Sequence, residues 1–190
     1  MLDVLVAPER DTLTEPIVAW RTWVLAGSSD GAEVRLLPLF GDRRPWPPRE
    51  PHRAWCVRRG RHPVPSLSCT CGLYATHGLE GLRRSRDPGV LGTVALWGRV
   101  VEHAAGYRAE YAYPQRLRLV CFVCFFLAGP DRSAPCDTAV RHRGGRIVPL
   151  CAEHLELCRR YGYPMPRLLD GRALEQRLLD TYAVDPLRRI

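Results

Sequence analysis

The chain of 190 residues contains no lysine and no asparagine, so all 28 of its basic residues are arginine. Without lysine there can be no Gly-x4-Gly-Lys-Ser/Thr loop, which cradles phosphates in many nucleotide hydrolases. The bias indicates a GC-rich coding sequence first and a functional preference only second. Long apolar runs are lacking too: the longest, Leu117 to Gly129, is interrupted by Arg118 and is too short to span a bilayer.

Sequence signals for export and for catalysis are also missing. The first residues include Asp3, Glu9 and Asp11 and lack the basic start and apolar stretch of a signal peptide, so we expect a cytoplasmic protein that does not engage a membrane. No Gly-x-Gly-x-x-Gly or His-Glu-x-x-His motif occurs, nor the paired His-x-Glu and Pro-Cys-x-x-Cys motifs of deaminases. We therefore expect no enzyme.

Eight cysteines are present, and four ligand-type residues in the C-terminal third have the spacing of a structural zinc site. Two residues separate the members of each pair, and a gap of 26 residues separates the pairs. A two-residue spacer lets both side chains of a pair reach one ion, and the gap can fold into a hairpin. We predict one Zn²⁺ bound by Cys121, Cys124, Cys151 and His154.

A second group of ligand-type residues lies upstream, with the spacing Cys-x5-His-x6-Cys-x-Cys. Gly72 follows the last cysteine and can supply the open backbone that a metal-binding turn needs. A disulfide across the single residue of the Cys-x-Cys pair would be strained. We predict a second Zn²⁺, and so two per chain, at Cys56, His62, Cys69 and Cys71.

Other assignments stay open at both sites. In the C-terminal site, Cys121 and Cys124 could instead be core cysteines, and Cys136 or Cys158 could replace a ligand. In the upstream site the Cys-x-Cys pair could be reactive or merely buried. The histidines that could replace a ligand there are His52, His77 and His103.

Most of the chain before residue 117 shows the alternation and turn signals of β-hairpins. The four strand-like runs are 17–25, 33–40, 94–103 and 107–113. Gly98 suggests either a bulge in the third run or a close approach by another segment. Pro114 is expected to end the fourth, because proline cannot donate a ladder hydrogen bond.

Helical periodicity appears only late, over about 151–161 and again over 171–183, where Asp170 is a candidate N-cap. A strand at 117–120, a metal-binding knuckle, a hairpin and ligands in the first helical turn together resemble a treble-clef zinc finger over residues 117–160. We predict an α+β fold with a β-rich body of antiparallel hairpins (domain 1–116). A treble-clef-like zinc finger and a short C-terminal helix follow (domain 117–190).

Two stretches carry a further resemblance: Cys69 to Ala75 (CTCGLYA) and Thr93 to Leu117 (TVALWGRVVEHAAGYRAEYAYPQRL). Over residues 17–117 the chain resembles an uncharacterised family of actinobacterial and mobile-element proteins. Its members share a tryptophan-rich first hairpin and a loop like Trp46-Pro47-Pro48. The resemblance implies a metal site and this fold, and it transfers no activity.

The net charge of +8 is concentrated in one segment, since Asp42 to His62 carries seven arginines and two acids. Arginine makes forked contacts with phosphate, so the segment is a candidate nucleic-acid surface. The alternative is a solvated loop in an arginine-rich protein. The candidate residues are Arg43, Arg44, Arg49, Arg53, Arg58, Arg59 and Arg61.

Together these features predict a non-enzymatic, zinc-stabilised binding module. We expect it to be a regulatory or accessory subunit of a nucleic-acid-handling complex, with a protein partner. The first alternative is a protein–protein adaptor without nucleic-acid contact. The second is a treble-clef nuclease in which His142 and Asp137 would hold a catalytic metal.

Overall fold

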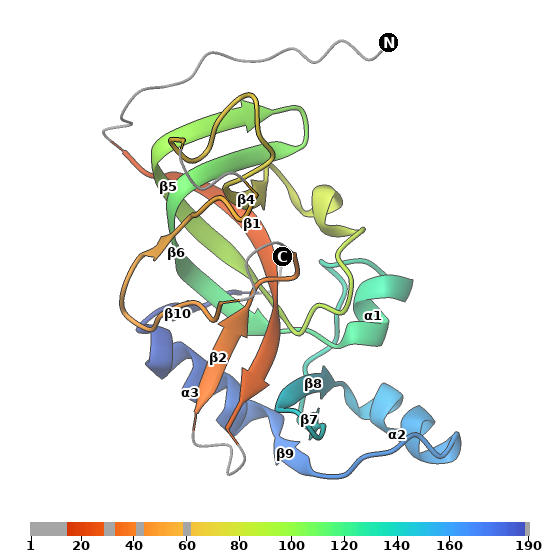
Figure 1. The fold of residues 1–190 in the computed structure, drawn as a ribbon. Coiled ribbons are helices and arrows are strands. Elements are labelled where there is room, and N and C mark those ends of the chain that lie inside the picture. Colours follow the sequence, from red (N-terminus) through yellow and green to blue (C-terminus); the bar gives the residue numbers. More distant parts are fainter. Residues whose placement is uncertain (1–14, 29–32, 41–43, 59–61, 189–190) are drawn as a thin grey trace.

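The computed structural model describes residues 15–28, 33–40, 44–58 and 62–188 (Figure 1). The helices within these ranges are the 3-10 helix η1 (Leu79–Leu82), α1 (Phe122–Leu127), α2 (Ala152–Arg160) and α3 (Gly171–Tyr182). The strands are β1 (Ile17–Gly27), β2 (Val34–Leu37), β3 (His52–Arg53), β4 (Leu73–Thr76), β5 (Val90–His103), β6 (Gly106–Leu119), β7 (Thr138–Arg141), β8 (Arg146–Leu150), β9 (Leu168–Asp170) and β10 (Asp185–Pro186). The α+β prediction, with a β-rich antiparallel body and short helices, is confirmed.

Four strands of the body close on themselves. β1 pairs with β5, β5 with β6, β6 with β4, and β4 returns to β1, all antiparallel. The last pairing consists of the single partner pair Trp20 and Thr76, whereas β5 and β6 pair along almost their whole length. The ring of four strands is therefore most weakly paired between β1 and β4, and we call this junction the seam.

The long β5–β6 hairpin contains two irregularities, and the sequence pointed to the first of them. A register shift between Trp97 and Val100 surrounds Gly98, which has φ of 73°, so the expected bulge is present. The expectation that Pro114 ends the strand is wrong, because β6 continues to Leu119. A second register shift, between Thr93 and Val94, lies where Val94 pairs with Pro114, and such an irregularity accommodates a residue without an N–H.

The C-terminal third is attached to the same central strand. The end of β1 pairs with β2 and with β8, and β8 forms a hairpin with β7, which also pairs with β9. β6 runs through the predicted domain boundary at 116/117, and the division into two domains stays a prediction. None of the helices within the described ranges is long and apolar enough to cross a membrane.

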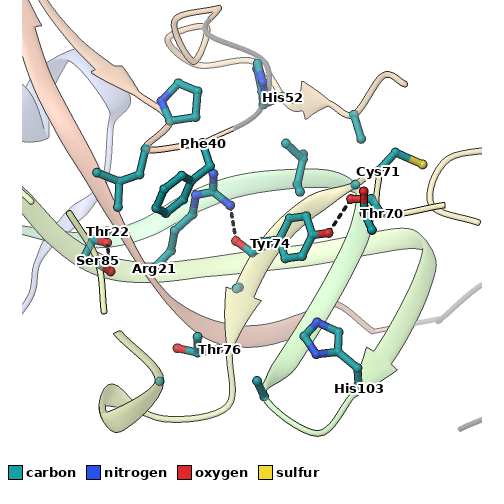
Figure 2. A pocket seen from close by; sticks show the side chains of 18 of the residues that line it. Arg21, Thr22, Phe40, His52, Thr70, Cys71, Tyr74, Thr76, Ser85 and His103 are labelled. Atoms are coloured by element: carbon teal, nitrogen blue, oxygen red, sulfur yellow. Dashed lines mark hydrogen bonds between the residues drawn. The ribbon is translucent and has the colours of Figure 1, made fainter. Parts of the chain in front are cut away.

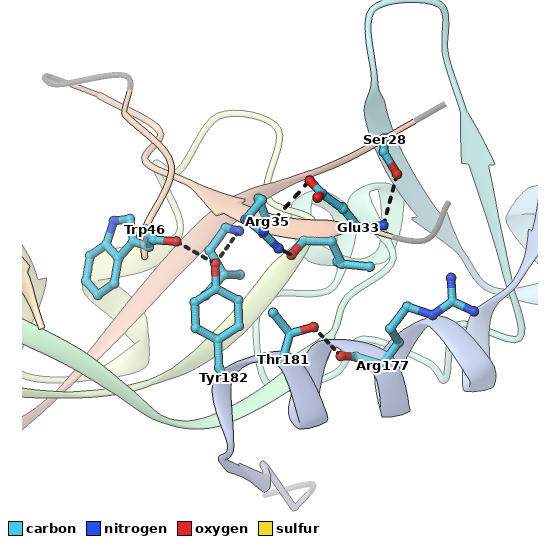
Figure 3. A network of polar contacts seen from close by, with 9 residues as sticks. Ser28, Glu33, Arg35, Trp46, Arg177, Thr181 and Tyr182 are labelled. Atoms are coloured by element: carbon cyan, nitrogen blue, oxygen red, sulfur yellow. Dashed lines mark hydrogen bonds and ion pairs between the residues drawn. The ribbon is translucent and has the colours of Figure 1, made fainter. Parts of the chain in front are cut away.

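Helix α3 docks on the body through a buried face that includes Leu174, Leu178 and Tyr182, and Figure 3 shows the polar contacts of Tyr182. The Tyr182 hydroxyl donates to the carbonyl of Trp46 and accepts from the backbone N–H of Leu36, both at 2.9 Å. At the other end of the helix, the Asp170 side chain accepts from the N–H of Ala173 at 2.8 Å, so the expected N-cap is present. These contacts fix α3 against β2 and against the loop that contains Trp46.

Candidate metal centres and an adjoining cleft

The C-terminal cluster brings together the four residues predicted for it, and all four are buried. The Nδ1 atom of His154 lies 3.5, 3.4 and 3.1 Å from the sulfur atoms of Cys121, Cys124 and Cys151 respectively. The sulfurs of Cys124 and Cys151 are 3.7 Å apart, far beyond a disulfide bond. In a regular tetrahedron around zinc, the S···S edge is about 3.8 Å and the S···N edge about 3.5 Å. The donor set therefore fits one tetrahedral Zn²⁺.

Local structure explains how these residues meet. Cys121 is the N-cap of α1 and Cys151 the N-cap of α2, so each pair consists of an N-cap and a residue of the first turn. The first pair was expected on a knuckle, and the apolar run Phe122–Leu127 instead forms the short helix α1. Burial raises the pKa of the Cys121 thiol to about 12, so a cation is needed to hold this sulfur as thiolate at neutral pH.

The upstream cluster also brings together its four predicted residues, but only Cys56 is fully buried. The sulfurs of Cys56 and Cys69 are 3.7 Å apart, again near the edge of a zinc tetrahedron. The Nδ1 atom of His62 lies 2.7 Å from the Pro63 carbonyl, which leaves Nε2 as the ligand atom. That Nε2 is buried and has no hydrogen-bond partner among the described residues, as expected for an atom that binds a metal.

An arginine of the body holds the loop that carries two of these ligands. Arg108 of β6 donates through Nη1 to the carbonyls of Ser66 (3.2 Å), Cys71 (3.1 Å) and Cys69.

A hydrogen bond from the Cys71 backbone lowers the pKa of the Cys69 thiol, and burial raises the pKa of the Cys71 thiol. Gly72 has φ of 126°, and a Cβ there would meet Pro65 and Arg108 at 3.1 and 3.0 Å, so the loop requires the predicted glycine. Each cluster can hold one zinc ion, and the buried one is the more secure.

The candidate substitute ligands lie elsewhere. His52 stacks on Trp46 with 5.0 Å between ring centroids, and His77 contacts Glu102 at 3.2 Å. His103, Cys136 and Cys158 do not belong to either cluster of the described structure. For the nuclease alternative, Asp137 forms an ion pair with Arg172 at 3.1 Å, and neither it nor His142 is part of a described metal cluster.

The basic segment divides into two groups. Arg49 donates to the Asp180 carbonyl at 3.1 Å, and Arg53 pairs with Glu110 at 3.2 Å, so both are tied to the body. Arg44 and Arg58 are exposed, and the Arg44 guanidinium lies over the ring of Trp55 at 5.7 Å. The remaining candidates, Arg43, Arg59 and Arg61, lie outside the described residues.

A cleft of about 610 Å³ opens beside the upstream cluster, along the seam between β1 and β4 (Figure 2). Its walls include Phe40, Tyr74 and Trp55, and three ligands of the upstream cluster line it as well: Cys56, Cys69 and Cys71. The volume is within the range of small-molecule sites, about 300–1,000 Å³. The weak seam of the strand ring leaves this space open, and the upstream metal centre forms part of its wall.

The cleft is positively charged. Arg21 of β1, Arg58 and Arg84 line it, and no aspartate or glutamate is among its described lining residues. Arg21 reaches across the seam, where Nη1 donates to the Tyr74 carbonyl, while its Nε has no partner among the described residues. Its guanidinium lies over the ring of Trp46 at 5.0 Å. Burial lowers the pKa of Arg21 to about 10, so it stays charged at neutral pH.

Sequence reasoning missed Arg21, Phe40 and Tyr74 as functional candidates. The one available signal was a charged residue in the middle of the otherwise strand-like run 17–25. The closure of β4 onto β1, which brings Tyr74 to Arg21, depends on pairing between segments more than 50 residues apart and has no local signature.

Comparisons with known proteins identify no relative. No family model matches the chain, and neither a curated protein nor a solved structure matches it with significance. The resemblance of residues 17–117 to an actinobacterial family stays a prediction. The structure shows a β-rich α+β fold with two Cys/His clusters that are suited to zinc.

Proposed function

We propose that this protein is a non-enzymatic, zinc-stabilised module that binds nucleic acid through the surface around Trp55. The observation that carries the proposal is the exposure of Trp55, at 59%, with the guanidinium of Arg44 over its ring. An exposed aromatic ring beside arginine is the arrangement on which bases of single strands stack.

The upstream metal centre supports this reading, because Trp55 and Val57 flank its ligand Cys56. Both flanking side chains are exposed, although burial of such residues is favourable, and Cys56 between them is buried. A metal at Cys56 therefore holds the segment in place while Trp55 faces solvent. Arg58 continues the same exposed stretch.

The C-terminal cluster supports a non-catalytic role for its metal. Three cysteines and one histidine complete a tetrahedron, which leaves no position for water. The ligand order, with the β7–β8 hairpin between a first pair and a second pair at the start of α2, resembles that of a treble-clef finger, although the first pair lies at the start of α1 and not on a knuckle. We assign this finger a supporting role within a nucleic-acid-handling complex.

Exposed apolar residues favour a second candidate function, a protein–protein adaptor. Leu127 at the end of α1 is 79% exposed, and Tyr161 and Tyr163 after α2 are 72% and 64% exposed. Large exposed apolar side chains are frequent where a protein partner docks. In this alternative the arginines of the basic segment would meet an acidic protein surface.

Fluorescence anisotropy with labelled single-stranded DNA, duplex DNA and RNA tests the proposal. We expect single strands to bind and to lose affinity with salt, with a log–log slope of about −0.7 per phosphate contacted. Trp55→Ala should weaken binding about tenfold or more, because one stacked base is lost. Tyr161→Ala is the matched control, since it removes an even more exposed aromatic ring, 72% against 59%, from a distant part of the sequence.

Two results would reject the proposal. Absence of binding to all three ligands at low salt would leave the adaptor function. Cleavage of DNA or RNA by the pure protein with magnesium or manganese would instead establish the nuclease.

A further inference from the structure

We infer that the cleft between β1 and β4 receives one nucleotide unit, with its base between the aromatic walls and the acceptor edge of that base toward Arg21. This inference deepens the proposed function, because the rim of the cleft is the surface around Trp55. The same chemistry could come from a nucleotide within a strand or from a free nucleotide, and the test below separates the two.

The shape and lining of the cleft favour a flat, largely apolar group. Phe40, Trp55 and Tyr74 present aromatic rings, and Phe40 is 67% exposed although it is large and apolar. Figure 2 shows the ring of Phe40, from the segment after β2, and the ring of Tyr74, from β4, on either side of the Arg21 side chain. A base that entered here would cover these rings, as stacked bases do in single-strand binding proteins.

The charges of the cleft require the ligand to carry acceptors or negative charge. Arg21, Arg58 and Arg84 line the space, and no carboxylate among the described lining residues neutralises them. A guanidinium has five N–H donors, and the hydrogen bond described for Arg21 uses Nη1, toward the Tyr74 carbonyl. The forked donors of arginine match the paired acceptors on the edge of a base, most closely guanine.

The rim provides a place for the phosphate. Arg58 and Arg84 are exposed, whereas Arg21 lies deeper beside Trp46. A nucleotide is arranged in a matching way, with a planar base at one end and a charged phosphate at the other. Its base can therefore reach Arg21 while its phosphate stays at the solvent-exposed arginines.

The hydroxyl groups and the His103 imidazole of the cleft are uncharged at physiological pH and can tolerate a base, whereas three thiolates around one Zn²⁺ would give the upstream metal centre a single negative charge, fewer than the three arginines carry. Thr22 and Ser85 hydrogen-bond to each other at 2.9 Å. Burial, with Arg108 and His77 nearby, lowers the pKa of His103, and its buried Nε2 has no partner among the described residues. The upstream metal centre completes the wall without an open ligand position, so the cleft is suited to binding and not to hydrolysis.

The test compares a single strand of about 10 nucleotides with the same backbone lacking all bases, and with free GMP and AMP. The variants are Arg21→Met and Phe40→Ala, and Arg160→Met is a control at an exposed arginine of α2. We expect each cleft variant to weaken binding of the base-bearing strand about tenfold or more, and binding of the abasic strand by less than about twofold. Zinc content and melting temperature verify folding, and Phe40 is exposed enough for its loss to leave both unchanged.

The outcomes separate this inference from the proposed function. If both cleft variants bind the base-bearing strand as the wild type does, while Trp55→Ala does not, strands cross only the rim and the cleft inference is wrong. If no strand binds but GMP does, with loss in Arg21→Met, the cleft binds a free nucleotide and the proposed function is wrong. Absence of binding by every ligand rejects both.

Discussion

The two Cys/His clusters contain the same donor atoms, three sulfurs and one imidazole nitrogen, in opposite surroundings. All four ligands of the C-terminal cluster are buried, whereas in the upstream cluster three of the four are partly exposed. The first cluster lies where α1, α2 and the β7–β8 hairpin meet, among buried apolar side chains that include Phe125, Ile147 and Leu150. The second lies at the edge of an existing core and forms the wall of a cleft.

This difference teaches what each metal does for the molecule. The buried cysteine ligands belong to the same hydrophobic core as the body and lie at the starts of two short helices, the six-residue α1 and the nine-residue α2, so a metal there joins these helices to that core. The body already has a core that includes Trp23, Leu96 and Leu117, all fully buried. Its metal therefore shapes a local surface, which carries Trp55 and borders Arg21.

The largest expected effect is the loss of a ligand from the buried cluster. Cys151→Ser should release one zinc and unfold the C-terminal third, because zinc binding contributes about 10–16 kcal/mol in small structural sites. Native mass spectrometry gives the zinc count, and circular dichroism gives the melting curve. Cys158→Ser is the matched control, since this cysteine lies on the same helix outside the cluster. A Cys151→Ser protein with two zincs and an unchanged melting curve would show that the ligand assignment is wrong.

An intermediate effect is expected at the upstream cluster. Cys69→Ser should release the other zinc and weaken single-strand binding, while the body keeps most of its melting temperature, since its strand pairings do not involve this loop. The zinc count, the melting curve and the fluorescence anisotropy of one sample test this prediction. Ser68→Ala, at the neighbouring exposed position, is the control. If Cys69→Ser melted as low as Cys151→Ser, the contrast between the two clusters would disappear.

Both clusters could be predicted from the sequence because each contains closely spaced ligand pairs, two in the C-terminal cluster and one, Cys69-x-Cys71, in the upstream cluster. Cys121-x2-Cys124 and Cys151-x2-His154 each close within one turn, and Gly72 marks the other loop. The predicted knuckle at Cys121 was wrong because a helix of six residues satisfies the same spacing. Periodicity could not show this in so short a segment.

The cleft could not be predicted because it depends on contacts between distant segments. Arg21 and Tyr74 meet only after β4 closes the strand ring onto β1 through one residue pair. The extension of β6 beyond Pro114 has a similar cause, since its accommodation depends on a register shift in the partner strand β5. Local propensity carries no information on either feature.

The smallest expected effect concerns the attachment of α3, which connects the two regions without metal. Tyr182→Phe leaves the Leu36 N–H and the Trp46 carbonyl without a partner in a buried place, so unfolding free energy should fall by about 1–3 kcal/mol at pH 8. Both zinc ions should remain, because the hydroxyl contacts neither cluster. Urea unfolding of the two proteins, with zinc counted by mass spectrometry, measures this. Loss of a zinc in Tyr182→Phe would mean that α3 supports a cluster and that the two regions are not independent.

The pH dependence of the same variant gives an independent readout. Burial raises the pKa of Tyr182 to about 12, above its value of about 10 in an unfolded chain. Below pH 10 the phenol is neutral in both states and its contribution is constant. Above pH 10 the unfolded chain loses the proton first, so the wild-type protein loses stability by at most about 1.4 kcal/mol per pH unit up to pH 12. Phenylalanine cannot ionise, so the difference between the two proteins should narrow from pH 9 to pH 11. A constant difference over that range would show that burial does not hold the proton on the Tyr182 hydroxyl in the folded protein.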